Sequence, residues 1–265
     1  MRRMFQSSES HAHLASRGWA SLPSLTADET ARLFALAVEH ESRCMSHAKS
    51  CDTGFDELWG NALKSERDAV QDSIASVMAP ALDRWFEGYR AVLYNLFTKR
   101  RRSPRSVVRY HFDFAIVDER GGDSAIQLWI PLVDATPENG ALIVREWSHR
   151  RVTPIRPHDY VHPASADSLT SLPRDAVRPP QRAGQGVAFL NRTMHGSPPN
   201  LSADDRPAVG VIVVPDALSL VHWVCPSPER AELWALSDAD FRALRPGCVL
   251  EGARLVETVY RAKST

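Results

Sequence analysis

The sequence lacks the features that mark several large classes of protein. No window of its 265 residues reaches the roughly 18 consecutive apolar residues that a membrane-spanning helix needs. Arg2 and Arg3 are not followed by an apolar core, so the first 20 residues do not have the pattern of a secretory signal. Lys and Arg number 32 and are balanced by 32 Asp and Glu, which argues against a dedicated nucleic-acid binder. These absences predict a cytoplasmic protein that binds neither membrane nor nucleic acid.

Cysteine is also scarce. The four cysteines (Cys44, Cys51, Cys225 and Cys248) show no CxxC spacing of the kind that redox and zinc motifs use. We interpret them as reduced, packed thiols, as expected in the cytoplasm. The remaining composition, with 43% hydrophobic and 24% charged residues, is that of an ordinary globular protein.

The N-terminal third has the hydrophobic spacing of helices. Thr26 and Glu29 form a capping-box pattern, and apolar residues at helical intervals follow it. A second apolar stripe runs from Val70 to Met78, and we expect Pro80 to end that helix. The mixed segment between them, residues 53–65, predicts a loop.

Beyond about residue 90 the apolar runs are short, rich in β-branched and aromatic residues, and bounded by Gly, Pro, Asn or Asp, which is typical of strands. These runs cover residues 91–97, 107–111, 125–132, 140–144, 187–190 and 208–214. The pattern predicts a mainly β protein, with a sandwich or barrel core and flanking helices.

We expect one domain over residues 1–265. It would consist of a helical buttress (1–90), the β core (91–225) and a C-terminal helix and tail (226–265), with the helix beginning near Ser237. Residues 149–185 are rich in Pro, Arg, Ser and Asp, which predicts a long excursion within the core. Long loops on β scaffolds are often functional, so we expect this excursion to cover a substrate.

The most informative positions are His111 and Asp113. Side chains two residues apart on a strand point to the same side, so this imidazole and carboxylate can aim at one point. A third ligand would complete the two-His, one-carboxylate triad that holds Fe(II) and leaves three positions open. His195 is the strongest candidate, because it lies between two strand-like runs that can return beside His111 in an antiparallel core.

Arg206 lies eleven residues beyond His195, at the start of the next apolar run. A buried arginine beside an open iron site can bind the far carboxylate of 2-oxoglutarate in a bidentate pair. A His-x-Asp pair alone is more often a surface pair than a metal site. Its combination with His195 and Arg206 favours metal binding.

The order and spacing of these motifs resemble the phytanoyl-CoA dioxygenase family, which includes ectoine hydroxylase and bacterial hydroxylases of amino acids and natural products. The resemblance is carried by His-x-Asp at 111–113, WIPLVDATPENG at 129–140, Ser148-His149, HGS at 195–197 and Arg206, and extends from Gly18 to about Glu257. The chain differs from the usual family pattern at residues 146–149, where EWSH replaces Pro-Gly-Ser-His, and in its basic run at 99–102.

The resemblance implies a double-stranded β-helix (jelly-roll, cupin-like) core that binds Fe(II) through His111, Asp113 and His195. It also implies that Arg206 binds the distal carboxylate of 2-oxoglutarate. By the same resemblance, Ser197 and Gln127 contact this cosubstrate. The implied reaction uses O₂ to hydroxylate an unactivated C–H bond of a small molecule, such as an amino-acid derivative or a natural-product intermediate, and releases succinate and CO₂.

Several alternatives remain open at this point. The same site could catalyse desaturation, epoxidation or rearrangement. A cupin-like barrel holding Zn or Mn could catalyse hydrolysis or isomerisation, although Arg206 would then have no role. A catalytically silent binding module would be indicated by loss of a ligand residue, and none is missing. We expect a monomer or weak homodimer.

Some polar residues have an ordinary interpretation. We expect the basic run at 99–102, with Arg105, to be a solvated turn, or else an attractor for an anionic substrate or acyl carrier. His149, His158 and His162 lie in the irregular segment and are expected to be solvated, or at most to line the entrance of the site.

Overall fold

The computed structural model describes residues 5–47, 54–58, 64–158, 174–244 and 252–260. Its α-helices are α1 (Ser8–Arg17), α2 (Ala27–His47), α4 (Lys64–Trp85) and α5 (Asp238–Ala243). Its strands are β1 (Trp19–Ser24), β2 (Phe55–Glu57), β3 (Tyr89–Lys99), β4 (Val108–His111), β5 (Ile126–Pro131), β6 (Ile143–Arg145), β7 (Ala176–Val177), β8 (Gln185–Leu190), β9 (His195–Ser197), β10 (Arg206–Pro215), β11 (Leu220–Ser227), β12 (Arg230–Leu236) and β13 (Arg254–Tyr260).

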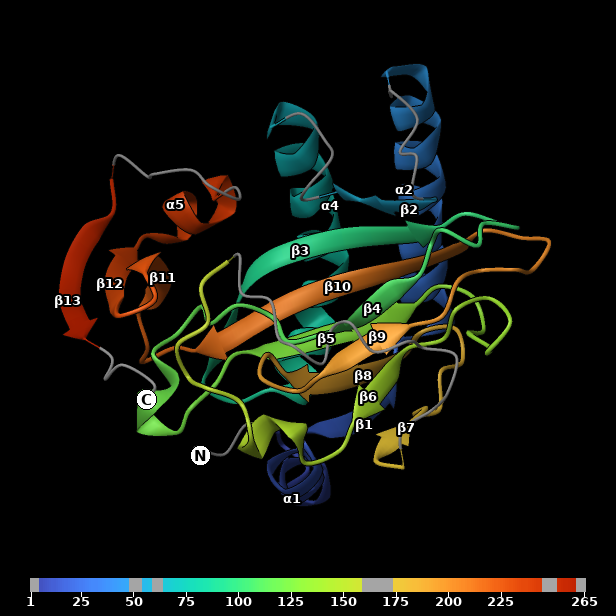
Figure 1. The fold of residues 1–265 in the computed structure, drawn as a ribbon. Coiled ribbons are helices and arrows are strands. Elements are labelled where there is room, and N and C mark those ends of the chain that lie inside the picture. Colours follow the sequence, from blue (N-terminus) through green and yellow to red (C-terminus); the bar gives the residue numbers. More distant parts are fainter. Residues whose placement is uncertain (1–4, 48–53, 59–63, 159–173, 245–251, 261–265) are drawn as a thin grey trace.

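Two antiparallel sheets form the core, and the smaller sheet faces the larger one (Figure 1). The larger sheet has the strand order β1-β8-β5-β10-β3-β2, and the smaller one has the order β4-β9-β6-β7. Side chains from both sheets pack in one buried cluster that includes Trp129, Val144 and Phe189. This arrangement confirms the predicted mainly β, jelly-roll type of core.

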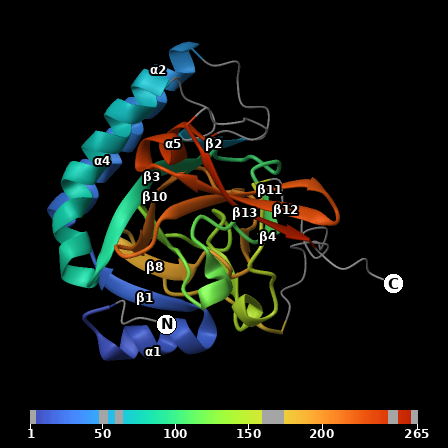
Figure 2. The same cartoon turned by 90° about the vertical axis from the view of Figure 1, so that its left-hand side faces the viewer.

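Successive side chains along each strand of the larger sheet point to opposite faces, so the two faces have different neighbours. On β5, Leu128 and Ile130 pack in the cluster that contains helical residues, whereas Trp129 between them packs between the two sheets. Figure 2 shows α2 and α4 lying along the outer side of this sheet. The helices therefore cover one face, and the other face is left for the interior between the sheets.

The helical capping box was predicted correctly. The backbone N–H of Glu29 donates to Thr26 Oγ1 at 3.1 Å, and that of Thr26 donates to Glu29 Oε2 at 2.8 Å. The predicted end of the second helix was wrong, because Pro80 lies inside α4, which continues to Trp85. Ala81 and Trp85 are buried in the same cluster as the sheet residues, and this packing outweighs the hydrogen bond that proline removes.

The chain ends contribute more strands than the sequence predicted. Within residues 1–90, β1 and β2 form the two edges of the larger sheet. Within 226–265, α5 begins with the expected cap at Ser237. Instead of forming a tail, β12 pairs with β11 and β13 pairs with β12 in a separate sheet. Among the described residues, no helix is both long and apolar enough to cross a membrane.

Candidate metal centre

β4 and β9 bring His111, Asp113 and His195 together. His111 and His195 are directly paired across these two strands. Nε2 of His111 lies 3.6 Å, and Nε2 of His195 3.9 Å, from Asp113 Oδ1. One potential ligand atom from each residue lies within 4.8 Å of the others, and the buried Asp113 Oδ2 has no hydrogen-bond partner in the part of the chain that the structure describes. Two imidazoles and one carboxylate at this spacing fit the ligand set of Fe(II).

Backbone carbonyls orient both imidazoles. Nδ1 of His111 lies 2.9 Å from the carbonyl oxygen of Arg109, and Nδ1 of His195 lies 3.0 Å from that of Thr193. A carbonyl only accepts, so each Nδ1 donates its hydrogen and each Nε2 keeps its lone pair for a metal. Burial lowers the pKa of His195 to about 4, and His111 contributes to this shift. His195 is therefore neutral, as a metal ligand must be.

Local contacts hold β9 in its place. Gly196 lies where a Cβ would approach the carbonyl oxygen of Val108 to 2.8 Å, so the close approach of β9 to β4 requires glycine. The Ser148 hydroxyl accepts a hydrogen bond from the N–H of Met194 at 2.8 Å and donates one to the Arg145 carbonyl at 2.7 Å. The serine of the EWSH segment thus anchors the residue that precedes His195.

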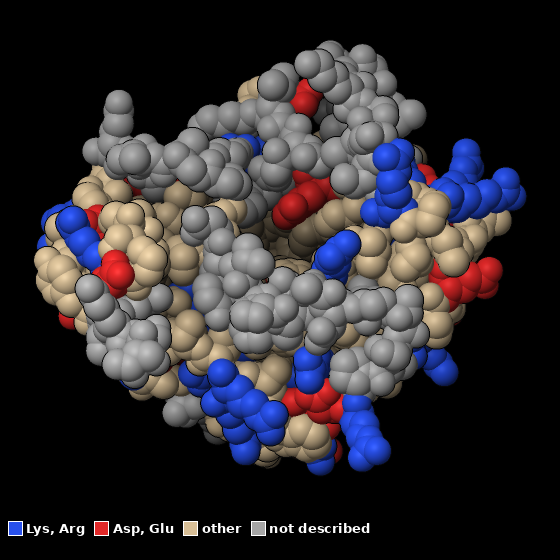
Figure 3. Space-filling view, in the orientation of Figure 1, with Lys and Arg blue, Asp and Glu red and all other residues tan. Residues whose placement is uncertain are grey.

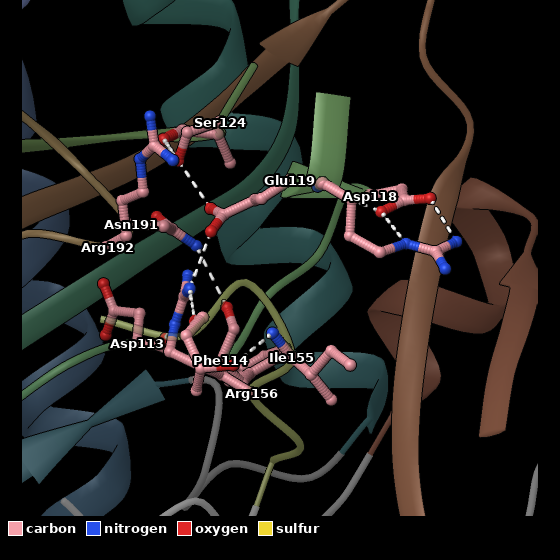
Figure 4. Close-up of polar contacts among 12 residues, drawn as sticks. Asp113, Phe114, Asp118, Glu119, Ser124, Ile155, Arg156, Asn191 and Arg192 are labelled. Atoms are coloured by element: carbon pink, nitrogen blue, oxygen red, sulfur yellow. Dashed lines mark hydrogen bonds and ion pairs between the residues drawn. The ribbon is translucent and has the colours of Figure 1, made fainter. Parts of the chain in front are cut away.

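A buried ion pair supports Asp113 from the other side (Figure 4). Arg156 Nη1 lies 2.6 Å from Glu119 Oε2, and neither side chain is exposed. Arg156 Nε donates to the backbone carbonyl of Asp113 at 2.7 Å, and Ser124 donates to the second oxygen of Glu119 at 2.6 Å. This network fixes the backbone of Asp113 relative to the segment that carries Arg156.

Arg206 and Lys99 form a buried cationic pair at the ends of β10 and β3, where they are directly opposite one another. Arg206 is 2% exposed and Lys99 0%. Nε and Nη1 of Arg206 have no hydrogen-bond partner among the described residues. Its Nη2 reaches the Gly140 carbonyl at 3.4 Å, and its guanidinium lies 5.1 Å from the Trp129 ring centroid. Within the described ranges, no carboxylate forms an ion pair with either residue.

The pKa values of these two cations reflect their burial. Burial lowers the pKa of Lys99 to about 6, and the neighbouring Arg206 charge adds to the effect. Burial alone lowers the pKa of Arg206 to about 9, so the guanidinium stays charged at neutral pH. A buried arginine without a counter-ion is unfavourable unless an anion binds to it.

Ser197 and Gln127, the other two residues predicted to contact 2-oxoglutarate, also lie in the interior between the two sheets. Ser197 is two residues beyond His195 on β9, and its carbonyl accepts a hydrogen bond from Lys99 Nζ at 3.2 Å. Gln127 lines a cavity together with Asp113, and its buried Oε1 has no partner. In the orientation of Figure 1 the surface is hollowed near its middle, with acidic and basic side chains beside the hollow (Figure 3).

The structure also corrects two expectations about polar residues. Lys99 is not part of a solvated turn, because strand alternation places it on the same face as Asn95 and Phe97, toward the interior. His149 is 5% exposed, and burial lowers its pKa to about 4. His158 is half-buried beside Phe114. His162 and the middle of the expected 149–185 cover lie outside the described residues.

Sequence reasoning missed Glu57, Asn95 and Arg156. Glu57 stands in a segment expected to be a loop, and no motif marks Asn95. Arg156 lies in the irregular stretch, where no motif marks it. For Lys99 a signal did exist, since it continues the alternation of the apolar strand 91–97.

Residues 9–208 match the model of the phytanoyl-CoA dioxygenase family. The chain belongs to this family. It is therefore a 2-oxoglutarate-dependent dioxygenase by class, with Fe(II) as its metal, as the sequence resemblance implied. The sequence has no significant match among curated proteins.

Several solved structures share the fold of this chain. AviO1 from Streptomyces viridochromogenes Tue57 is 24% identical, with a TM-score of 0.55 over 83% of this chain and 97% of that one. The non-heme α-ketoglutarate-dependent epimerase SnoN from nogalamycin biosynthesis is 18% identical, with a TM-score of 0.58 over 93% and 90% of the two chains. The carbocyclase SnoK from the same biosynthesis is 21% identical, with a TM-score of 0.55 over 95% and 96%.

Proposed function

We propose that His111, Asp113 and His195 bind Fe(II), and that the enzyme hydroxylates a C–H bond of a small molecule. The observation that carries the proposal is the buried Arg206 guanidinium, which has no anionic partner in the described chain. Its neighbour Lys99 contacts the carbonyls of Ser197 and Pro198, at 3.2 and 2.5 Å. The cations thus lie at the Ser197 end of the short strand that begins with His195.

This placement suits 2-oxoglutarate, which carries a carboxylate at each end. Arg206 would bind the distal carboxylate through its guanidinium, with Lys99 as a second positive charge and Ser197 nearby. The keto-acid end would then reach the metal held by His195. Gln127, whose Oε1 is unpartnered, would contact the cosubstrate or substrate in the adjoining cavity.

When bound, iron and 2-oxoglutarate supply an oxidant that is generated with O₂ while 2-oxoglutarate is converted to succinate and CO₂. The chain's own residues contribute geometry to this reaction. His111, Asp113 and His195 occupy one side of the centre and leave the other side open for cosubstrate and O₂. The cavity beyond Asp113 would hold the substrate carbon close to the centre and keep water away from it.

The presence of Asp113 favours hydroxylation, because related halogenases have Gly or Ala at this position and so make room for chloride. Desaturation, epoxidation and rearrangement use the same ligand set and remain alternatives. SnoN and SnoK, which share the fold, are described as an epimerase and a carbocyclase. We further propose that the protein acts in the cytoplasm, as a monomer or weak homodimer.

The proposal is tested by anaerobic addition of Fe(II) and 2-oxoglutarate to metal-free protein. We expect a weak visible charge-transfer band that requires both additions. In Asp113→Ala, which loses the one anionic ligand, we expect weaker Fe(II) binding and no coupled succinate formation. Asp216→Ala, which removes an exposed carboxylate, is the matched control and should behave as wild type. Wild-type succinate formation by Asp113→Ala would exclude Asp113 from the metal centre.

A further inference from the structure

The cavity beside the proposed metal centre has an apolar wall, a polar corner, and further polar residues (Asp113, Gln127 and Asn191) that include a proposed metal ligand. Leu93, Phe97, Phe114 and Ile212 supply the apolar wall. Glu57 and Asn95 form the polar corner, and Asn95 Nδ2 donates a hydrogen bond to Glu57 Oε1 at 2.8 Å. Such a cavity fits a ligand that combines a hydrocarbon part with polar groups.

Strand pairing fixes Glu57 in this corner. On β2 and β3, Glu57 is directly opposite Phe97, and Asn95 is the next residue of β3 on the same face. Phe55, two residues before Glu57, stacks on Phe97 with a centroid distance of 6.0 Å. The carboxylate is therefore held by a packed strand and does not depend on a long flexible loop.

Charge makes this corner selective. Of the residues that line the cavity, only Glu57 and Asp113 carry a charge, and both are acidic. In the proposed function Asp113 is neutralised by the metal, whereas Glu57 forms no ion pair with any described residue. Burial raises the pKa of the Glu57 carboxyl, opposed by the Asn95 hydrogen bond, while the charge of Asp113 adds to the rise. A cationic ligand would compensate for this loss of solvation.

We propose that Glu57 and Asn95 form a subsite that binds an amine cation of the substrate, while the apolar wall binds its hydrocarbon part. The inference rests on the proposed function, because it assumes that this cavity is the substrate side of the metal centre. The interior then has two ends of opposite charge. The anionic cosubstrate binds at the Lys99–Arg206 end, and the cationic group binds at the Glu57 end.

The test compares three probes of similar size: benzylamine, benzyl alcohol and benzoate. Binding is measured by ligand-observed NMR on protein loaded with Ni(II) and saturating 2-oxoglutarate, so that turnover does not occur and the Lys99–Arg206 end is filled. We expect benzylamine to bind wild type about ten-fold or more tighter than either other probe, as for a charge-assisted hydrogen bond. Glu57→Gln, which keeps an acceptor for Asn95, should abolish this preference.

Asp56→Asn is the matched control. Asp56 is the adjacent residue on β2, and its carboxylate pairs with Arg100 Nε at 2.5 Å, outside the cavity lining. This variant removes a neighbouring negative charge and should keep the wild-type preference for the amine. A preference lost equally in both variants would indicate a general charge effect and overturn the assignment to Glu57.

The remaining outcomes are also decisive. Wild-type protein that binds no amine, that binds the alcohol as tightly as the amine, or that keeps its amine preference in Glu57→Gln would overturn the subsite. Failure of the proposed function is separately visible, because 2-oxoglutarate would then show no metal-dependent binding to wild type.

Discussion

Arg156 and Arg206 are both buried, 0% and 2% exposed, yet they have opposite surroundings. Arg156 pairs with Glu119 and donates to two backbone carbonyls, those of Asp113 and Thr153. Arg206 reaches one carbonyl at the limit of hydrogen-bond distance and has two donor nitrogens without partners. A buried arginine with its own carboxylate stabilises the scaffold, whereas one without a carboxylate marks the place where an external anion binds.

The largest expected contrast is in the stability of the ligand-free protein. Arg156→Met leaves the Glu119 carboxylate buried and unpaired, which should lower the free energy of unfolding by about 3–5 kcal/mol. Arg206→Met removes an unpaired buried charge and should leave that free energy unchanged or raise it. Urea unfolding of the two variants and wild type measures both effects. Similar losses in the two variants would remove the distinction between the arginines.

A smaller effect concerns the proton on Lys99. Its pKa of about 6 in the free protein lies below neutral pH, so at pH 7.5 it is mostly uncharged, and a bound carboxylate would raise that pKa. Binding of 2-oxoglutarate should therefore take up a proton, and its affinity should fall by up to about ten-fold per unit as pH rises above 6. Calorimetry of the Ni(II)-loaded protein in buffers of different ionisation enthalpy gives the proton count.

Lys99→Met is the control for this linkage. It should bind 2-oxoglutarate more weakly near pH 6 and show no proton uptake from this position. Uptake that is unchanged in Lys99→Met would assign the proton to another group, and would leave Lys99 with only its contacts to the Ser197 and Pro198 carbonyls.

The sequence was most informative where period-two alternation and short-range chemistry decide the structure. Alternation placed His111 and Asp113 on one side of the chain, and the capping box placed the start of α2. The sequence could not show that Pro80 stays within a helix, because tertiary packing of Ala81 and Trp85 decides where that helix ends. The pairing of β13 with β12 likewise depends on contacts between distant parts of the chain.

Buried charges were the hardest features to predict. Lys99 and Arg156 resemble surface residues by composition, and each is buried by contacts with distant parts of the chain: β10 pairs with the strand that carries Lys99, and Glu119 pairs with Arg156. Glu57 enters the interior only because β2 pairs with the end of β3. No local pattern contains these pairings, so the cationic and acidic ends of the cavity become visible only in the fold.

The affinity of Arg206→Ala for 2-oxoglutarate tests the central claim most directly. Under anaerobic conditions, Fe(II) should bind Arg206→Ala about as tightly as it binds wild type. Titration of the Fe(II)-loaded variant with 2-oxoglutarate should show an affinity lowered by about 30-fold to several thousand-fold, the usual effect of removing one partner of a buried charge pair. Arg206→Lys should recover only part of the loss, because an ammonium cannot form the bidentate pair. Wild-type affinity for 2-oxoglutarate in Arg206→Ala would contradict the account.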